Sequence, residues 1–320
     1  MSEVRYHHAE ITESQAGMRL DQALAKIFTN YSRSSLKGWI DAGRVTLNSA
    51  PCRPRDGVRS GDIVHLTAIL EGSQDIAPEI VDFEVVHADE SCLVVDKPAG
   101  CVVHPGAGNS GQTLVNGLLY RYPELAALPR AGLIHRLDKY TSGLLIVART
   151  SQAYQLLIRA MAARKIKRVY DALAIGKFVA GGTINEPIGR DPANRTRMKV
   201  RNDGRNAITH YRIVTKFRAH THLEVHLETG RTHQIRVHLA HIGHSLVGDS
   251  RYGSRLVLPP APSTELEAVM RRIDRQALHA RHLEFEHPLD AHVIGVDSPL
   301  PPDFKQLLEV CAADLSAAGG

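Results

Sequence analysis

The chain has 320 residues, 43% of them hydrophobic, so it can bury the core of one large domain and of a small one beside it. Its 39 Lys and Arg residues exceed its 34 Asp and Glu residues by a formal charge of only +5. The four cysteines lie far apart without a CxxC pair, which argues against a disulfide framework and a cysteine-rich zinc site. No apolar signal core or long apolar run occurs, so we expect a soluble cytoplasmic protein.

Residues 1–14 are polar and are predicted to form an N-terminal tail or an edge strand. Residues 15–70 form a small domain in which apolar side chains recur at the spacing of one helical face, namely Leu20, Ala23, Leu24, Ile27 and Phe28. A second helix around Trp39 is predicted to begin after Ser32 as its N-cap and to end just before Gly43. Two short strands should follow, over residues 44–48 and 63–66.

Positive charge is concentrated in this small domain. Residues 17–66 contain eight basic and four acidic residues, which accounts for most of the surplus of the whole chain. Arg33, Lys37 and Arg44 cluster around the second predicted helix, where they could contact a phosphate backbone. The alternative is a solvated surface that binds nothing.

An acidic stretch that contains proline, residues 71–81, has the composition of a linker. A second domain should span residues 82–310, followed by a C-terminal tail over 311–320. Its first clear strand, residues 92–95, precedes a literal GxGxxG pattern at Gly106–Gly111 and a helix over residues 113–120. A dinucleotide-binding site would need an acidic residue about 20 positions further on, and none lies between Glu124 and Asp138. We therefore interpret the pattern as a loop.

Two short apolar runs, Gly132–Ile134 and Leu144–Ala148, are predicted to be strands that flank a polar turn. Arg136 and Asp138 lie two residues apart, so on a strand they would share a face. A charged pair beside buried strands is a candidate for a functional site. The alternative is that the carboxylate of Asp138 accepts hydrogen bonds from the backbone of its own turn.

Two further basic regions follow. After a helix over residues 151–165, the run that contains Arg164, Lys165 and Lys167 leads into a strand over residues 169–176. The second region, residues 189–205, includes Arg195 and Arg197 among Pro, Asn and Gly, and is predicted to be a mobile loop. Both regions could bind RNA phosphates. A loop that is merely solvated is the alternative for the second.

Strands over residues 209–214 and 222–229 precede the segment Gly230–His238. Four histidines of this part of the chain raise the possibility of a zinc site: His233, His238, His241 and His244. No HExxH pattern and no cysteine partners accompany them, so we predict that they bind no metal.

The motif His135-Arg136-Leu137-Asp138, followed after two residues by Thr141-Ser142-Gly143, resembles the HRLDxxTSG signature of the RluA family of pseudouridine synthases. Further family motifs recur in order: Lys97-Pro98-Ala99-Gly100, Gly230-Arg231-Thr232-His233-Gln234-Ile235-Arg236, Gly248-Asp249 with Tyr252-Gly253, and Leu278-His279-Ala280. The length and domain order are most similar to the branch that modifies large-subunit ribosomal RNA. The two helices and strands near the N-terminus resemble the αL (S-four-type) RNA-binding module. The resemblance implies an α+β fold, with that module joined to a catalytic domain built on a long, mostly antiparallel mixed sheet flanked by helices and loops.

The resemblance also implies residue roles. Asp138 would be the catalytic carboxylate, and Arg136 would occupy the space of the flipped target base or hold its backbone. Tyr170 would pack on the uracil, Arg236 would pair with the catalytic carboxylate, and Leu278 would line the pocket. The reaction would need no cofactor, and the partner would be ribosomal RNA, bound by a monomer with no membrane contact. A non-catalytic RNA-binding or ribosome assembly factor is the main alternative, although it need not keep these residues together.

Overall fold

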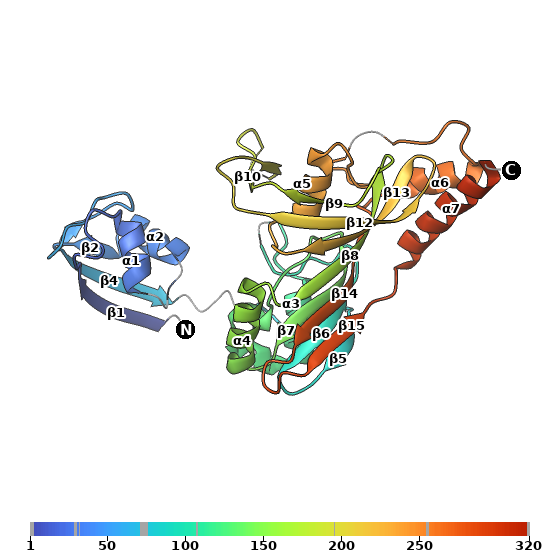
Figure 1. Cartoon of the computed structure of the whole chain (residues 1–320). Coiled ribbons are helices and arrows are strands. Elements are labelled where there is room, and N and C mark those ends of the chain that lie inside the picture. Colours follow the sequence, from blue (N-terminus) through green and yellow to red (C-terminus); the bar gives the residue numbers. More distant parts are fainter. Residues whose placement is uncertain are drawn as a thin grey trace. The chain divides into compact units, whose positions relative to one another are not determined.

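The computed structural model describes residues 3–28, 31, 33–70, 76–106, 108–194, 196–253 and 256–318. The chain divides into two compact units, residues 1–75 and 76–320 (Figure 1). Within the described ranges, no helix combines the length and the apolar character that crossing a bilayer would require.

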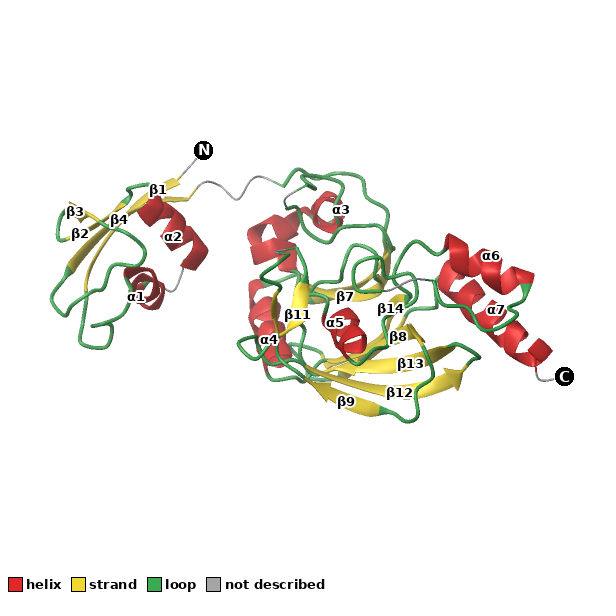
Figure 2. Ribbon diagram, turned by 90° about the horizontal axis from the view of Figure 1, so that it is seen from above, coloured by secondary structure: helices red, strands yellow, loops and turns green. Residues whose placement is uncertain are grey.

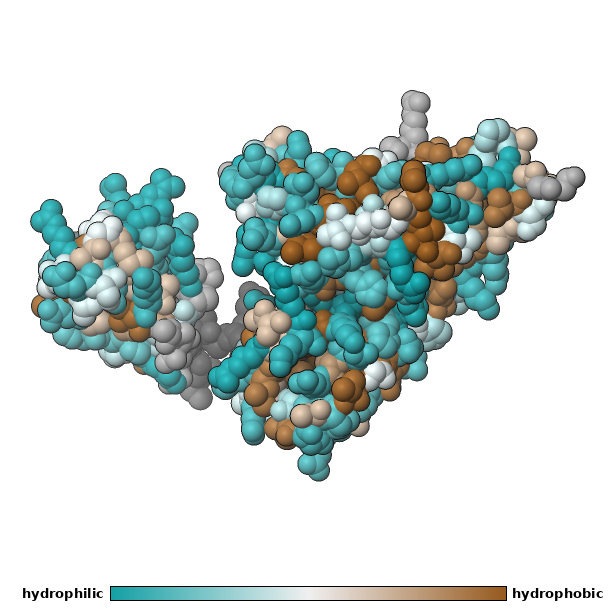
Figure 3. All heavy atoms as spheres, in the orientation of Figure 1, coloured by the Kyte–Doolittle hydropathy of each residue, from teal (hydrophilic) through white to brown (hydrophobic). Residues whose placement is uncertain are grey.

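The N-terminal unit packs two helices against a four-stranded sheet. The helices are α1 (Leu20–Ile27) and α2 (Arg33–Asp41), and the strands lie in the order β1 (Glu3–Glu10), β4 (Ile63–Leu70), β2 (Val45–Leu47) and β3 (Ala50–Pro51). The two predicted helices and two predicted strands are therefore confirmed. Their apolar faces meet in one core that includes Leu20, Leu24, Leu36, Val45 and Leu66. Figure 3 shows mostly hydrophilic side chains on the visible face of this unit, as expected when the apolar residues are inside.

The ends of α2 and the N-terminal segment of this unit can be compared with the predictions from the sequence. Gly43 follows α2 with φ +69°, and its N–H donates to the carbonyl of Ile40 at 3.0 Å, as predicted for a helix C-terminus. The N-cap predicted at Ser32 lies outside the described residues. Of the two alternatives predicted for residues 1–14, the edge strand is confirmed and the tail is wrong for Glu3–Glu10, which pair antiparallel with β4 over their whole length. The side chains of this strand are mostly exposed, so its sequence shows no hydrophobic pattern. Backbone hydrogen bonds to β4 hold it at the edge of the sheet.

The C-terminal unit is built on one nine-stranded sheet. Its main path runs in the spatial order β5 (Glu84–Ala88), β6 (Cys92–Lys97), β7 (Ser142–Ala148), β14 (Leu278–Glu286), β8 (Lys167–Ile175), β13 (His220–Leu227), β12 (Ile208–Lys216) and β9 (Gly182–Asn185), and β15 (Val293–Asp297) pairs with β14. The pair β7–β14 is parallel and the other pairs are antiparallel. This confirms the mostly antiparallel mixed sheet.

Helices cover both faces of this sheet (Figure 2). They are α3 (Leu114–Arg121), α4 (Ser151–Ala162), α5 (Gln234–His241), α6 (Thr264–Arg272) and α7 (Pro302–Ala318), with short 3-10 turns η1 (Pro123–Ala127) and η2 (Pro129–Gly132). Alternate residues of a strand face opposite sides. Leu145 of β7 therefore packs in the core that contains α3 and α5, whereas Leu144 packs in the core that contains α4.

The strand predicted over Gly132–Ile134 is wrong. Gly132 ends the turn η2, and Leu133 makes only an isolated bridge to Val147. Gly132 has φ +76°, and a Cβ there would lie 2.0 Å from the carbonyl oxygen of Ala148. This close approach requires a glycine and replaces regular pairing with a turn. Arg136 and Asp138 consequently lie on a loop rather than on one face of a strand.

Three predicted irregular regions also differ from the structure. Of the linker predicted over residues 71–81, residues 71–75 lie outside the described ranges, and Glu79 accepts hydrogen bonds from Gln112. The second unit therefore begins at residue 76 rather than 82. The predicted tail 311–320 is wrong because α7 extends to Ala318, and buried Asp314 accepts the backbone N–H of Ser263. The basic loop over residues 189–205 contains an antiparallel ribbon of β10 (Ile188–Arg190) and β11 (Met198–Val200).

Candidate active site

A cavity of about 490 Å³ opens in the C-terminal unit beside the loop that carries the signature motif. Its lining includes six arginines but only two carboxylates, Asp138 and Glu228. The arginines are Arg130, Arg136, Arg164, Arg168, Arg231 and Arg236. Burial and the charges of Arg205 and Arg164 lower the pKa of Arg231, which shows how closely the positive charges are gathered. Such a cavity suits a polyanionic ligand.

Backbone contacts fix the turn that presents Asp138. The N–H of Thr141 donates to the carbonyl of Asp138 at 3.1 Å. The next carbonyl, that of Lys139, accepts from Gly100 N–H at 2.9 Å and from the Nζ of Lys97 at 3.1 Å. Lys97 is fully buried, and its Nζ also donates to two carbonyls of the Lys97–Cys101 loop. The Lys97-Pro98-Ala99-Gly100 motif therefore holds in place the turn that contains Asp138.

Arg236 joins Asp138 to a second carboxylate. Its Nη1 lies 2.8 Å from Oδ2 of Asp138, so the predicted pairing is confirmed. Its Nε and Nη2 form a two-pronged ion pair with Asp249, at 2.7 and 2.9 Å. Burial opposes the charge of Arg236, but Asp249 and Asp138 raise its pKa above the ordinary value. The guanidinium is therefore a fixed cation behind the carboxylate that faces the cavity.

Asp249 is a buried anchor for this arrangement. Burial alone would raise its pKa, yet Arg236 and the backbone N–H groups of Tyr252 and Arg251 hold the pKa below the usual range. Both N–H groups donate to its Oδ1 at 3.0 Å. The Gly248-Asp249 motif is visible in the sequence, but it does not predict a role for Asp249. Its partner, Arg236, lies 13 residues away, and only the fold brings the two together.

His233 and Tyr252 complete the surroundings of Asp138. The Nε2 of His233 is 3.8 Å from Oδ1 of Asp138, and its Nδ1 is hydrogen-bonded to the Tyr252 hydroxyl at 2.7 Å. Burial lowers the pKa of His233 even though Asp138 favours its charged form. The imidazole is thus neutral at physiological pH. Both residues stand inside motifs that the sequence displayed, but the predicted set omitted them.

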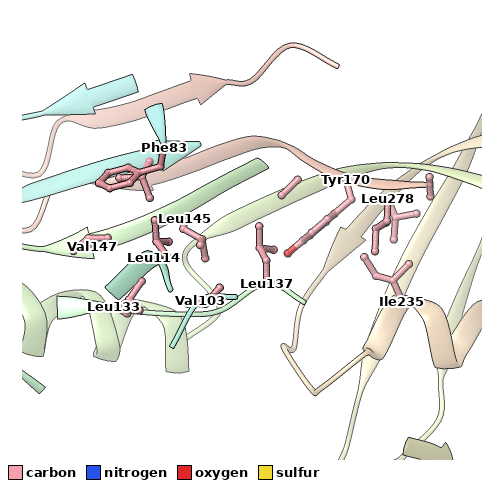
Figure 4. Packing of buried hydrophobic residues seen from close by; sticks show 14 of the residues in the cluster. Phe83, Val103, Leu114, Leu133, Leu137, Leu145, Val147, Tyr170, Ile235 and Leu278 are labelled. Carbon is pink, nitrogen blue, oxygen red and sulfur yellow. The ribbon is translucent and has the colours of Figure 1, made fainter. Parts of the chain in front are cut away.

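Three largely buried side chains of one apolar cluster line the same cavity as the charged groups. Tyr170 on β8, Leu278 at the start of β14 and Ile235 on α5 are each about 5% exposed or less and belong to one core cluster. Figure 4 shows Leu278 and Ile235 side by side, with the Tyr170 hydroxyl pointing toward Leu137. Burial raises the pKa of Tyr170, so its hydroxyl keeps its proton at neutral pH. A flat aromatic ring could stack in such a slot.

Arg136 differs from these buried groups because its side chain is exposed. It lines the first cavity and also a second one of about 730 Å³, which shares Asp138, His233 and Arg236. The structure therefore brings all five residues predicted to act in catalysis, Asp138 and the four supporting residues, to the lining of one cavity.

The basic residues predicted to bind RNA are more dispersed. Arg164 lines the first cavity and is ion-paired with Glu228. Lys165 and Lys167 are exposed, and Lys167 is ion-paired with Glu284 on β14. The guanidinium of Arg197 lies over the Tyr252 ring, 5.3 Å from its centroid. The prediction for Arg195 lies outside the described residues.

The N-terminal unit has its own basic groove, of about 950 Å³. Its lining includes the predicted Arg33 and Lys37 together with Arg19, Arg53 and Arg55, but not the predicted Arg44. Asp21, at the base of the groove, binds Arg33 at 2.6 Å and Arg19 at 3.0 Å. Burial would raise the pKa of Asp21, but these arginines lower it.

The nucleotide alternative at Gly106–Gly111 finds no support in the contacts around it. The N–H groups of Leu114 and Val115, at the start of α3, donate to the carbonyls of Val102 and Val103. Thr113 caps the next free N–H, that of Asn116. A pyrophosphate would need these donors unoccupied.

The four histidines of the zinc hypothesis do not converge within the described part of the chain. His238 binds Thr209 and the carbonyl of Glu186, and His244 binds the carbonyl of Ile175. His233 faces Tyr252 and Asp138 instead.

A model of the RNA pseudouridylate synthase family matches residues 91–241, and a model of the S4 domain matches residues 18–64. The chain is 48% identical to ribosomal large subunit pseudouridine synthase D of Pseudomonas aeruginosa over the full length of both. It is 49% identical to the protein of that name in Xanthomonas campestris and 47% identical to that of Escherichia coli K12. These matches cover 97% and 96% of this chain and 94% of each relative.

Solved structures agree. Human RNA pseudouridylate synthase domain containing 1 superposes with a TM-score of 0.54 and 26% identity, over 70% of this chain and 85% of that one. Human RNA pseudouridylate synthase domain containing 4 shares the fold, with a TM-score of 0.55, 22% identity and coverage of 71% and 92%. The chain therefore belongs to the RNA pseudouridylate synthase family and carries an S4 domain. The family and the branch predicted from the signature motif are confirmed.

Proposed function

We propose that this chain converts uridine to pseudouridine in large-subunit ribosomal RNA, and that Asp138 acts directly on the target nucleotide. The observation that carries the assignment of Asp138 is its position. It faces a cavity of basic lining, with Arg236 behind it and buried apolar side chains along the same cavity. The names of the most similar relatives support the choice of RNA.

The arrangement suits an isomerisation. Pseudouridine formation breaks the bond between C1′ and N1 of uridine and joins C1′ to C5 of the same base, so no external group is consumed. A carboxylate that reaches the ribose or the base can serve as nucleophile or base. Arg236 compensates the charge of Asp138 in a site that excludes much of the water, and the hydrogen bond from Lys97 keeps the turn in place.

The target base must leave the RNA stack to reach Asp138. We propose that the uracil stacks against Tyr170 and touches Leu278, and that exposed Arg136 occupies the space that the base vacates. A guanidinium is planar and can stack on neighbouring bases while it binds a phosphate.

We propose further that the groove of the S4 domain, with Arg33 and Lys37, and the basic residues Arg164, Lys165, Lys167 and Arg197 hold the RNA backbone. We also propose that the protein acts as a monomer in the cytoplasm, on ribosomal RNA that is free or already within a precursor particle.

Mapping pseudouridine in ribosomal RNA tests the function. Cells that lack the protein should lose pseudouridine at specific positions of the large-subunit RNA, and the wild-type gene should restore it while a gene for Asp138→Asn should not. A non-catalytic assembly factor predicts an unchanged map or restoration by both genes. An unchanged map would reject the proposed activity, and restoration by both genes would reject the role of Asp138.

A further inference from the structure

Arg168 is a buried cation that the activity described above does not use. Arg168 is only 6% exposed. Its Nε is buried and has no hydrogen-bond partner within the described part of the chain. The guanidinium donates one long bond, from Nη2 to the carbonyl of Leu227 at 3.3 Å. Buried polar groups nearly always have partners, so an unpaired guanidinium N–H in a folded protein requires an explanation.

No carboxylate neutralises Arg168 among the described residues. Of the two acidic residues of the cavity lining, Asp138 is bound to Arg236, and Glu228 is bound to Arg164 and His210. The neighbouring imidazole of His135 is neutral, since burial and the charge of Arg168 lower its pKa to about 3. The Nε2 of His135 correspondingly accepts the backbone N–H of Ile146. Burying a cation without a partner is costly, so its retention suggests that a ligand supplies the missing acceptor.

The position of Arg168 identifies where that acceptor would be. Arg168 and Tyr170 are two residues apart on β8, so their side chains share one face of the strand, and both line the cavity of Asp138. Gly230 makes room for the guanidinium, because a Cβ at that position would lie 2.8 Å from Nη1. The cation therefore borders the slot where the target base would stack.

Building on the proposed function, we propose that Arg168 binds a carbonyl oxygen of the flipped uracil and stabilises the negative charge that the base carries while it is detached from the ribose. When the C1′–N1 bond breaks, its electron pair moves to the pyrimidine and spreads over N1 and the two carbonyl oxygens. Meanwhile Asp138 either bonds to C1′ or holds the proton of C2′, so the ribose carries no uncompensated charge. The ring then turns and C5 bonds to C1′, which breaks the bond to Asp138 or returns the proton to C2′. The proton that leaves C5 is balanced by the proton that N1 takes up. A donor aimed at one oxygen stabilises the charged stage more than the neutral substrate, as catalysis requires.

Depth in the cavity favours the base over a phosphate as the ligand of Arg168. Arg136 and Arg164 are exposed at the same cavity, where phosphates can stay partly hydrated. Arg168 is buried beside Tyr170, where an aromatic ring would displace the water. The two classes of acceptor also predict different kinetics, because a phosphate contact contributes to binding and a base contact contributes to the chemical step.

The test combines variants of the full-length protein with altered RNA. The substrate is a large-subunit RNA segment with one mapped target uridine, replaced in turn by 2-thiouridine and 4-thiouridine, since sulfur is a weaker acceptor than oxygen. We expect Arg168→Met to lower the single-turnover rate on uridine by on the order of 10²-fold, with RNA affinity nearly unchanged. One of the two thio substitutions should slow the wild type, yet have little further effect on Arg168→Met.

Controls separate this account from a structural role. Arg168→Met removes an unpaired buried charge, so its melting temperature should equal or exceed that of the wild type. Arg271→Met removes an exposed guanidinium of α6 that is paired with Glu267, and it should keep the wild-type rate and the thio effect. Equal thio effects in wild type and Arg168→Met, a loss of RNA affinity with a smaller salt dependence, or a lowered melting temperature with an unchanged rate would each overturn the proposal. Wild-type protein that forms no pseudouridine would instead reject the proposed function.

Discussion

Arg236 bridges two carboxylates of different character. It binds Asp138 with one nitrogen, and it binds buried Asp249 with two. The first contact places a positive charge beside the carboxylate that lines the cavity, and the second fixes the guanidinium in the fold. A substitution at Arg236 should therefore change both the activity and the stability of the protein. A substitution in an ion pair with Asp138 alone would not remove the buried partner of Asp249.

Arg236→Met should abolish most activity and lower the free energy of unfolding by about 3–5 kcal/mol at pH 7, because Asp249 loses a buried partner. Arg236 contributes to the depressed pKa of Asp249, so this stabilisation is present above the unfolded pKa of about 4 and is lost as pH falls below it. The stability gap between wild type and variant should thus narrow in acid. Urea unfolding at pH 7, 4 and 3 measures the gap, because these values extend into the range below the unfolded pKa where the loss occurs.

Arg236→Lys is the matched control, since it keeps the charge and loses the planar fork. It should retain more single-turnover activity than Arg236→Met. If both variants lose activity equally while only Met loses stability, the geometry of the guanidinium matters to the reaction and its charge does not.

At the scale of elements, the loop after β6 holds the turn that presents Asp138. Lys97 donates to the carbonyls of Pro98, Cys101 and Lys139, and burial lowers its pKa to about 8. The ammonium thus joins two segments that lie 42 residues apart in sequence. Lys97 therefore connects the Lys97-Pro98-Ala99-Gly100 motif to the site, although the motif itself does not contact Asp138 through a side-chain hydrogen bond.

Lys97→Met should lower the reaction rate while the protein stays folded, because three carbonyls lose a donor and the turn of Asp138 becomes less well held. We expect a loss of on the order of 2 kcal/mol in stability at pH 7. The folded pKa of Lys97 lies below the unfolded value of about 10.4, so wild-type stability should rise slightly between pH 8 and 10. The variant should lack that rise in denaturant titrations. The same rise in both proteins would assign it to another group.

The elements that the sequence predicted correctly are those whose own side chains carry the signal. The face of Leu20, Ala23 and Leu24 predicted α1, and the run over Leu144–Ala148 predicted β7. The errors arose where distant segments decide the structure. The predicted C-terminal tail is part of α7, which continues to Ala318 where other segments bind Asp314. The choice between a tail and an edge strand at Glu3–Glu10 depended on pairing with β4.

The same division holds for the site. Motifs in the sequence predicted Asp138, Arg136, Tyr170, Arg236 and Leu278 as site residues, and the structure places all five along one cavity. No pattern in the sequence indicated that Asp249 shares Arg236, or that His233 lies between Asp138 and Tyr252. These contacts depend on how α5 and the loop after it pack on the sheet, which no local pattern reports.

At the scale of the whole molecule, the S4 domain should provide RNA affinity that the catalytic unit does not need for its chemistry. Lys37→Gln combined with Arg55→Gln removes two charges of the groove. The slope of log affinity against log salt should become shallower by about 1.5, with the bound complex reacting at the wild-type rate. Filter binding over a range of salt measures the slope.

The matched control removes two exposed charges of the same domain that do not line the groove, Lys26→Gln with Arg59→Gln. It should leave the slope near the wild-type value. An equal change in both double variants would show that only the net charge of the domain matters and that the groove is not the binding surface.

The central claim, that Asp138 performs the chemistry, is tested most directly by tritium release from RNA that carries C5-labelled uridine. Asp138→Asn keeps the shape of the side chain and removes its charge. We predict that the variant binds the RNA with an affinity close to that of the wild type and releases no tritium above background. Release at the wild-type rate by Asp138→Asn would contradict the account.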